Sequence, residues 1–179
     1  MTIADPASLQ ARAARVRLMI FDVDGVLTDG SLHFGADGEA LKTFSVLDGQ
    51  GIKMLQDSGV SIAIISARLS PIVARRATDL GIVHVQQGVH DKRLGFDQLA
   101  QRCAIAPEDC GYIGDDVIDL PILTRVGFAA SVPNGHAEVR SRVHYITEAN
   151  GGRGAAREIC DLLLRAQGKY EAALAPYLR

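Results

Sequence analysis

Two aspartates at the end of an apolar run are the first residues of this sequence whose types and spacing could do chemistry. Asp22 and Asp24 begin the stretch DVDGVLT, residues 22–28, at the carboxyl end of the apolar run 17–23. Gly25 lets the chain turn at once, so the two carboxylates can take separate roles, one attacking an electrophile and the other moving a proton. A strand-end turn rich in aspartate is the alternative interpretation of this stretch taken alone.

A second group of acidic residues follows another short apolar run. Asp115, Asp116 and Asp119 lie in the stretch GDDVID, residues 114–119. Three carboxylates crowded at one strand end repel one another unless a cation compensates their charge, and oxygen ligands of this kind suit Mg2+. The stretch therefore predicts a magnesium site, with helix capping as the alternative role of Asp119.

One serine and one lysine follow two further apolar runs and could bind a phosphoryl group. Ser66 follows the run 60–65, where its hydroxyl and the adjoining backbone N–H groups could hold a phosphoryl oxygen. Lys92 follows the run 82–86, where a cation would neutralise phosphoryl charge. Taken alone, Ser66 is better explained as a helix cap and Lys92 as a solvated surface residue.

The elements that must position these residues alternate along the chain. Apolar runs predict strands at residues 17–23, 60–65, 82–86, 111–114, 127–130 and 142–146. Amphipathic stretches predict helices at residues 48–58, 70–80, 91–103, 119–125, 136–141 and 153–167. This alternation is typical of a three-layer α/β fold, in which a parallel sheet has helices on both faces. All four candidate groups follow strands, so we expect them to meet at the carboxyl edge of the sheet, where such folds bind ligands.

Two segments do not fit this alternation. Residues 31–46 predict a β-hairpin around the turn-forming residues 36–38, and the hairpin would project beyond the sheet. The tail, residues 168–179, is weakly helical and contains Tyr177 and Arg179. Both segments have apolar residues that a monomer would expose, and an isolated hairpin is marginally stable in water. We therefore expect both to pack on neighbouring subunits of an oligomer. A frayed tail and a hairpin that folds back on its own sheet are the alternative.

The composition bounds the class of protein and its partners. A length of 179 residues predicts a single domain, 1–179, with one core. The hydrophobic fraction of 47% and the charged fraction of 22% are typical of a soluble globular protein. A net charge of -2 with both signs interspersed provides no basic field for nucleic acid, so the expected partner is a small molecule.

The cysteines and histidines indicate which cellular compartment and which kind of metal site to expect. Cys103, Cys110 and Cys160 form no CxxC pair and lie in or beside apolar stretches, which favours buried reduced thiols. The sequence shows no secretory signal and no apolar stretch long enough for a membrane span, so we expect a cytoplasmic protein. The five histidines lack metal-ligand spacing, which gives a zinc site little support.

Taken together and in order, DVDGVLT, Ser66, Lys92 and GDDVID resemble the four motifs of the haloacid dehalogenase superfamily of phosphohydrolases. The pattern spans most of the chain. The resemblance implies a Rossmann-like fold and magnesium-dependent hydrolysis of a phosphate ester through a phosphoaspartyl intermediate. It implies that Asp22 is the nucleophile and that Asp24 is the general acid for the leaving alcohol and then the general base for water. Ser66 and Lys92 would bind the phosphoryl group.

The same resemblance implies the metal ligands. Asp22, the backbone carbonyl of Asp24 and Asp115 would coordinate Mg2+. Asp116 and Asp119 would support the metal-bound water or Lys92 without touching the metal. One departure is Ala67, because many relatives have glycine beside the phosphate-binding serine. Alanine fits that position if its backbone is not left-handed.

The chain has no cap domain at either place where relatives insert one. Only the hairpin separates Thr28 from Asp48, and only one helix and one strand separate Ser66 from Lys92. The site would therefore lie open to solvent unless another subunit covers it. The stretches FDVDGVLTDG, VLDGQGIKML and NGGRGAAREICDLLL resemble capless sugar-acid phosphatases of this superfamily, which form ring-shaped homotetramers and serve lipopolysaccharide biosynthesis.

This closer resemblance implies the phosphate ester of an eight-carbon sugar acid as the substrate. Arg68 and Arg76 are candidates for binding the sugar carboxylate, because a guanidinium group suits a carboxylate, while surface salt bridges are the alternative. A nine-carbon sialic-acid-type 9-phosphate is the alternative substrate, since related chains use the same scaffold for it. A catalytically silent interaction module is the alternative of another class, and the intact motif residues argue against it.

Overall fold

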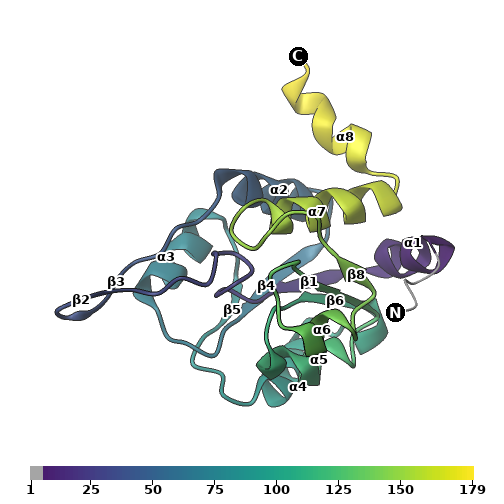
Figure 1. Cartoon of the computed structure of the whole chain (residues 1–179). Coiled ribbons are helices and arrows are strands. Elements are labelled where there is room, and N and C mark those ends of the chain that lie inside the picture. The colour runs from purple at the N-terminus through teal and green to yellow at the C-terminus, as the bar shows by residue number, and fades with distance from the viewer. Residues whose placement is uncertain (1–5) are drawn as a thin grey trace.

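A sheet of six parallel strands forms the centre of the protein in the computed structural model, which describes residues 6–179 (Figure 1). The strand order is β5-β4-β1-β6-β7-β8. The strands are β1 Leu18–Phe21, β4 Ser61–Ile65, β5 His84–Gln86, β6 Cys110–Ile113, β7 Phe128–Ser131 and β8 Tyr145–Ile146. Each overlaps one of the predicted apolar runs and pairs in parallel, so the predicted sheet is confirmed.

Helices cover both faces of this sheet. They are α1 Pro6–Arg15, α2 Val46–Asp57, α3 Pro71–Asp79, α4 Lys92–Cys103, α5 Leu120–Leu123, α6 Ala137–Arg140, α7 Ala155–Ala166 and α8 Tyr170–Leu174, with short 3-10 helices at Pro107–Asp109, Val117–Asp119 and Ala175–Tyr177. Successive side chains of β1 point to opposite faces. Met19 and Phe21 pack in a cluster with α1, α2, α3 and α7. Leu18 and Ile20 pack in a second cluster with α4, α5 and α6, which confirms the three-layer fold.

All six predicted helices are present with ends that differ from the predicted ones by at most two residues, and one further helix was not predicted. α2 begins at Val46 instead of residue 48, because the Ser45 hydroxyl accepts hydrogen bonds from the backbone N–H groups of Leu47 and Asp48. Helix α1 was absent from the predicted elements, although its sequence PASLQARAAR is rich in good helix formers. It lies against α7 and contributes Ala13 to the core. Residues 1–5 lie outside the described part of the chain.

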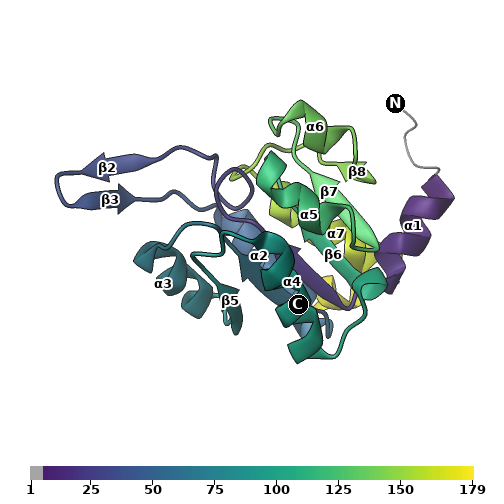
Figure 2. The ribbon, with the colours of Figure 1, turned by 90° about the horizontal axis from the view of Figure 1, so that it is seen from below.

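The predicted hairpin is present and projects from the body of the protein (Figure 2). Strands β2 His33–Gly35 and β3 Gly38–Leu41 form a separate antiparallel two-stranded sheet around the predicted turn. The hairpin is shorter than the predicted range, since residues 42–45 have no regular secondary structure and connect β3 to α2. Its large apolar side chains are Leu32, Phe34 and Leu41, which are 43%, 64% and 48% exposed.

The segment before α7 packs directly on the loop that follows β1. Gly152 N–H donates to the carbonyl oxygen of Val26 at 2.8 Å. A side chain at Gly151 would place its Cβ 1.7 Å from the carbonyl oxygen of Gly25. Glycine is therefore required at residue 151 by the close approach of two backbone segments, and the two loops must form together.

The burial expected for the cysteines is largely present. Cys110 and Cys160 are buried, Cys103 is half-buried, and all three are free cysteines. Among residues 6–179, no helix combines the length and apolar character that crossing a bilayer requires.

We expect Gly151→Ala to lower the free energy of unfolding by about 1–3 kcal/mol, because the new methyl group overlaps the backbone of the loop after β1. The melting temperature should fall by roughly 2–10 °C. Thermal unfolding followed by circular dichroism measures the change. Gly35→Ala is the matched control, since a Cβ there meets only the Ala40 methyl group at an ordinary 3.5 Å. Equal melting temperatures for the two variants would contradict the steric requirement.

Candidate active site

The candidate residues meet at the carboxyl edge of the sheet because three neighbouring strands end there in register. Phe21, the last residue of β1, pairs with Ile64 of β4 and with Ile113 of β6. The residues that follow each strand therefore emerge side by side. They include Asp22 after β1, and the loops containing Ser66 and Asp115 flank it.

Asp22 and Lys92 form a buried ion pair. Lys92 Nζ donates to Asp22 Oδ1 at 2.8 Å, and Asp22 as a whole is 5% exposed. Lys92 also donates to Asp119 Oδ1 at 2.5 Å and to the Tyr112 hydroxyl at 3.2 Å. The Lys92 side chain is 1% exposed, so the solvated-surface interpretation of this residue is wrong.

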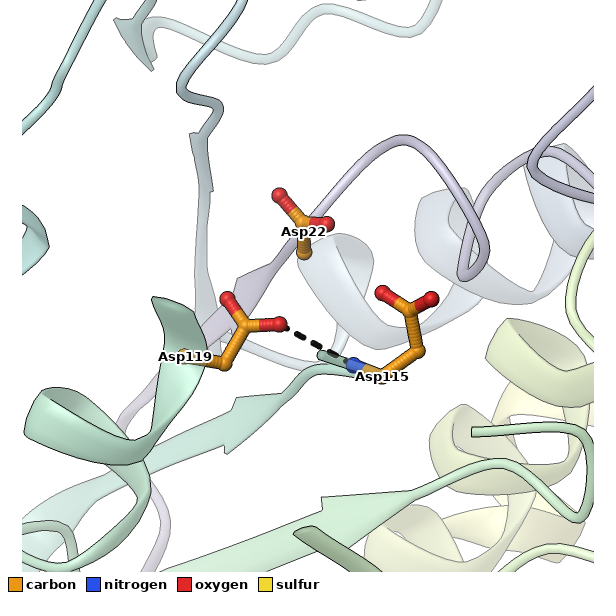
Figure 3. Close-up of side chains that lie close together, drawn as sticks. All are labelled: Asp22, Asp115 and Asp119. Carbon is orange, nitrogen blue, oxygen red and sulfur yellow. Dashed lines mark hydrogen bonds between the residues drawn. The ribbon is translucent and has the colours of Figure 1, made fainter. Parts of the chain in front are cut away.

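Asp119 connects this ion pair to the loop after β6. Its Oδ1 accepts from the Tyr112 hydroxyl at 2.6 Å, and its Oδ2 accepts from the backbone N–H groups of Asp115 and Asp116 at 3.0 and 3.1 Å. Figure 3 shows the bond to the Asp115 nitrogen. Asp119 is completely buried and holds both Lys92 and the backbone of this loop.

Three carboxylates of this site lie close enough to share a cation. Ligand oxygens of Asp22, Asp115 and Asp119 lie within 4.8 Å of one another, and Figure 3 shows their side chains gathered around one space. Asp115 also faces Gly25, where a Cβ would lie 2.1 Å from Asp115 Oδ2. Gly25 also has a φ of +96°, which favours glycine. Both the space beside Asp115 and the backbone conformation therefore require glycine in the turn after Asp22.

The carboxylates of Asp22, Asp115 and Asp119 carry more negative charge than Lys92 alone can compensate. Burial, and next the carboxylate of Asp119, raise the pKa of Asp22 to about 8. Burial, and next Asp119 and Asp116, raise the pKa of Asp115 to about 7. Burial alone would lower the pKa of Lys92, but the charges of Asp22 and Asp119 outweigh it and raise that pKa. A divalent cation with a preference for oxygen ligands fits this set of donors.

Asp24 has an environment of its own. It is half-buried, its Oδ1 accepts a hydrogen bond from Lys42 Nζ, and its Oδ2 lies 3.7 Å from Arg68 Nε. Lys42 follows β3 and forms a second ion pair with Glu39 at 2.9 Å. Burial alone would lower the pKa of Lys42, but its hydrogen bonds to the two carboxylates raise it. The ammonium group therefore stays charged.

Lys42 and Tyr112 contact residues of the candidate site but were not predicted from the sequence. Lys42 is the single lysine of the predicted hairpin, and the sequence predicts only an oligomer contact for that hairpin. Tyr112 interrupts the apolar run 110–113 with a hydroxyl that must find a partner when buried, and this signal could have identified it.

The remaining predicted residues have different surroundings. Ser66 is 3% exposed and accepts from the Arg68 N–H at 3.3 Å. Asp116 is exposed, and its carboxylate accepts from the Val117 N–H at 2.7 Å. Arg76 donates to the Ser45 carbonyl at 3.3 Å, and its guanidinium carbon lies 5.8 Å from the centre of the Phe44 ring.

The backbone at Ala67 fits alanine without strain. Among residues 6–179, Ala104 is the one non-glycine residue with a positive φ, so Ala67 is not left-handed. The substitution of the usual glycine is therefore compatible with the phosphate-binding loop expected at this position.

Comparison with known proteins gives consistent matches. A family model described as haloacid dehalogenase-like hydrolase matches residues 77–159. The 3-deoxy-D-manno-octulosonate 8-phosphate phosphatase KdsC of Escherichia coli (strain K12) is 46% identical over 167 residues, covering 93% of this chain and 89% of the relative. A probable YrbI family phosphatase structure from Pseudomonas syringae pv. phaseolica is 51% identical with a TM-score of 0.94, covering 97% of this chain and 98% of that one.

A third similar protein was solved with small molecules. The 3-deoxy-D-manno-octulosonate 8-phosphate phosphatase of Moraxella catarrhalis, in complex with magnesium ion, phosphate ion and KDO, is 40% identical with a TM-score of 0.94. The match covers 97% of this chain and 99% of that one.

We expect Lys92→Met to lower the free energy of unfolding by about 3–5 kcal/mol, because it leaves buried carboxylates without their cation. Adding Asp119→Asn should recover part of this loss, since one of the two stranded carboxylates becomes neutral. Guanidinium-induced unfolding in the presence of a chelator measures both variants. Arg93→Met is the control on the same helix, because the Arg93 side chain is 60% exposed and its ion pair with Asp97 is 3.9 Å long. A double variant whose loss equals the sum of its single losses would contradict this account.

Proposed function

Since this chain belongs to the haloacid dehalogenase-like hydrolases and is a phosphatase, we propose that it hydrolyses 3-deoxy-D-manno-octulosonate 8-phosphate to the free sugar acid and phosphate. The identity of 46% to the Escherichia coli phosphatase over almost the whole chain carries the proposal. The complex of the Moraxella catarrhalis relative supports it, because that structure holds both the sugar acid and phosphate. This assignment would place the chain in lipopolysaccharide biosynthesis.

We propose Mg2+ as the metal cofactor. The side chains of Asp22 and Asp115 and the backbone carbonyl of Asp24 would hold it, and the magnesium ion of the Moraxella catarrhalis relative supports this choice. The bound ion would supply positive charge to the phosphoryl oxygens. Asp119 is already fully engaged with Lys92, Tyr112 and two backbone N–H groups, which favours a supporting role over coordination.

In the proposed first step, Asp22 attacks the phosphorus atom of the ester. A bond forms between an Asp22 carboxylate oxygen and phosphorus, and the bond from phosphorus to the sugar oxygen breaks. The departing sugar oxygen takes a proton from Asp24. Lys92 already binds Asp22 Oδ1 and would attract the phosphoryl oxygens beside it, as the Ser66 hydroxyl would by donating a hydrogen bond.

In the proposed second step, water releases the phosphate. Asp24, now ionised, takes a proton from a water molecule as the water oxygen attacks the phosphorus atom. The bond between phosphorus and the Asp22 oxygen breaks, which restores the Asp22 carboxylate and yields inorganic phosphate. Asp24 regains in this step the proton that it gave in the first, so the cycle closes.

The sugar carboxylate needs a cationic partner, and we propose Arg68 and Arg76. The Arg68 side chain is 43% exposed and stands beside Asp24, so it can contact a substrate whose phosphate lies at Asp22. The Arg76 guanidinium donates one hydrogen bond, to Ser45, within the described residues and has further donors for a ligand. Asp116 is proposed to support metal-bound water.

We propose a homotetramer in which neighbouring subunits cover each active site. The hairpin forms its own two-stranded sheet with exposed apolar side chains, and such a sheet is marginal without a partner. Tyr177 and Leu178 of the tail are 58% and 73% exposed. A closed symmetric assembly would bury both segments and exclude water from the phosphoryl group.

We expect Asp22→Asn to abolish turnover while the fold persists, because an amide of similar shape cannot attack phosphorus. For the wild type, kcat/KM should be highest for 3-deoxy-D-manno-octulosonate 8-phosphate in a panel that includes the nine-carbon sialic-acid-type 9-phosphate. Phosphate release measures both. Full activity of Asp22→Asn would refute the mechanism, and a preference for the nine-carbon ester would refute the substrate.

The proposed metal ligands predict how two variants should depend on Mg2+. Asp115→Asn should raise the Mg2+ concentration for half-maximal activity by about tenfold or more, since it removes a proposed charged ligand. Asp119→Asn should change this concentration less, although it lowers kcat through Lys92. Activity titrations against Mg2+ provide the comparison. The reverse ranking of the two variants would mean that Asp119 coordinates the metal.

Deletion of residues 169–179 tests the shared site. We expect kcat/KM for the sugar phosphate to fall much more than that for a small activated ester, because a small ester needs no cover over a sugar. The Mg2+ requirement should stay unchanged. Light scattering at assay concentration is the companion measurement, and a fully active monodisperse monomer would exclude the tetramer.

A further inference from the structure

We propose that Lys42 is a positioning residue for Asp24 and that it decides which oxygen of the Asp24 carboxylate carries the catalytic proton. Lys42 occupies Oδ1, so the proton is exchanged at Oδ2. The inference rests on the proposed function, in which Asp24 is the general acid and base. Lys42 directly follows β3, the second strand of the hairpin of its own chain, so the hairpin acquires a role in the reaction besides any contact with a neighbour.

The contact between Lys42 and Asp24 is shielded from solvent. The Lys42 side chain is 1% exposed and the Asp24 side chain 21% exposed. Lys42 Nζ donates to Asp24 Oδ1. An exposed lysine would sample many rotamers and hold a carboxylate weakly, whereas a buried one retains its position.

A short relay of hydrogen bonds holds Lys42 in place. Its ammonium group lies 2.9 Å from Glu39, whose carboxylate accepts a hydrogen bond from the Ser70 hydroxyl. Ser70 is 1% exposed, caps α3 by accepting from the Val73 N–H at 3.3 Å, and donates its own N–H to Gln87 at 2.8 Å. The hairpin is thus tied to the elements that follow β4 and β5, and Lys42 cannot move independently of them.

The chemistry of an ammonium group makes the two Asp24 oxygens unequal. Lysine has three donors and no acceptor, and the carbonyl-type oxygen of a protonated carboxyl is a better acceptor than its hydroxyl oxygen, so the bond from Lys42 favours an unprotonated Oδ1. When Asp24 is protonated and keeps its bond to Lys42, the proton is therefore favoured on Oδ2. Oδ2 is 3.7 Å from Arg68 Nε, longer than a hydrogen bond, so it retains its capacity to give and take a proton.

A purely structural role for Lys42 makes a different prediction. If Lys42 only anchors the hairpin, its loss should affect all esters alike. If it positions Asp24, its loss should matter most where the leaving oxygen needs a proton, which is where the leaving alcohol is a weak acid. The dependence of kcat/KM on the acidity of the leaving group separates the two roles, and substituted phenyl phosphates provide it whichever sugar the enzyme uses.

The experiment compares wild type, Lys42→Met and Asp24→Asn, each saturated with Mg2+, across a series of substituted phenyl phosphates and the sugar phosphate. We expect Lys42→Met to lose about 10- to 100-fold in kcat/KM on the sugar phosphate, which is part of the 10²–10⁴-fold that general acid catalysis typically contributes. On the most activated phenyl ester, the loss in kcat/KM should be less than about threefold. Lys42→Arg, which retains the cation, should restore most of the loss. Glu39→Gln, which loosens the relay, should show the same dependence more weakly.

The control is Arg15→Met, which removes a cation of similar size at the opposite edge of the sheet. Arg15 pairs with Asp109 at 2.9 Å, and its side chain is 60% exposed. Its profile should match the wild type on every ester. If Lys42→Met does not fold, as judged by circular dichroism, Lys42→Gln replaces it in the same comparison.

The experiment distinguishes a failure of the positioning role of Lys42 from a failure of the proposed mechanism. If Asp24→Asn shows the steep dependence on the leaving group but the Lys42 variant loses equally on all esters, or loses nothing, the positioning role is overturned while the proposed mechanism stands. If Asp24→Asn itself shows no such dependence, Asp24 is not the proton donor, and both the mechanism and this inference fall.

Discussion

The burial of Lys92 between Asp22 and Asp119 is the interaction on which the rest of the site depends. An ammonium group is unfavourable in a protein interior unless carboxylates compensate it, and the carboxylates in turn are unfavourable without it. The chain meets both requirements by ending neighbouring strands at one edge and by opening α4 with the lysine. Asp119 adds the connection to the backbone of the loop that aims Asp115. Disturbing one of these groups therefore affects all of them.

Two identical side chains separated by one residue acquire different environments from this arrangement. Asp22 is almost fully buried and is paired with Lys92 from the body of the protein. Asp24 is half-buried and is paired with Lys42 from the projecting hairpin. Assigning a nucleophile and a proton carrier to two carboxylates requires such a separation of surroundings. Under the proposed mechanism, the hairpin would therefore contribute to catalysis within its own chain.

The predictable part of the structure is the part that local patterns govern. All six strands were predicted because each is a compact apolar run, and Ser66 and Lys92 were proposed as site residues because they follow such runs. The contact of Lys42 with Asp24 was missed because neither periodicity nor spacing records which residues of a hairpin turn inward. Helix α1 was missed because it precedes the first strand and so lies outside the alternation of strands and helices that predicted the others. The roles of Arg68 and Arg76 depend on a ligand and on neighbours that one sequence does not describe.

The contact of Gly151 and Gly152 with the loop after β1 has a consequence for how the protein folds during its synthesis. A ribosome synthesises DVDGVLT, Ser66, Lys92 and GDDVID well before residues 150–152. A nascent chain arrested between them would contain every motif, yet the nucleophile loop would lack the backbone that packs against it. The loop that contains Asp22 and Asp24 therefore gains this backbone contact late in translation, once residue 152 has left the ribosome and can donate its hydrogen bond to Val26.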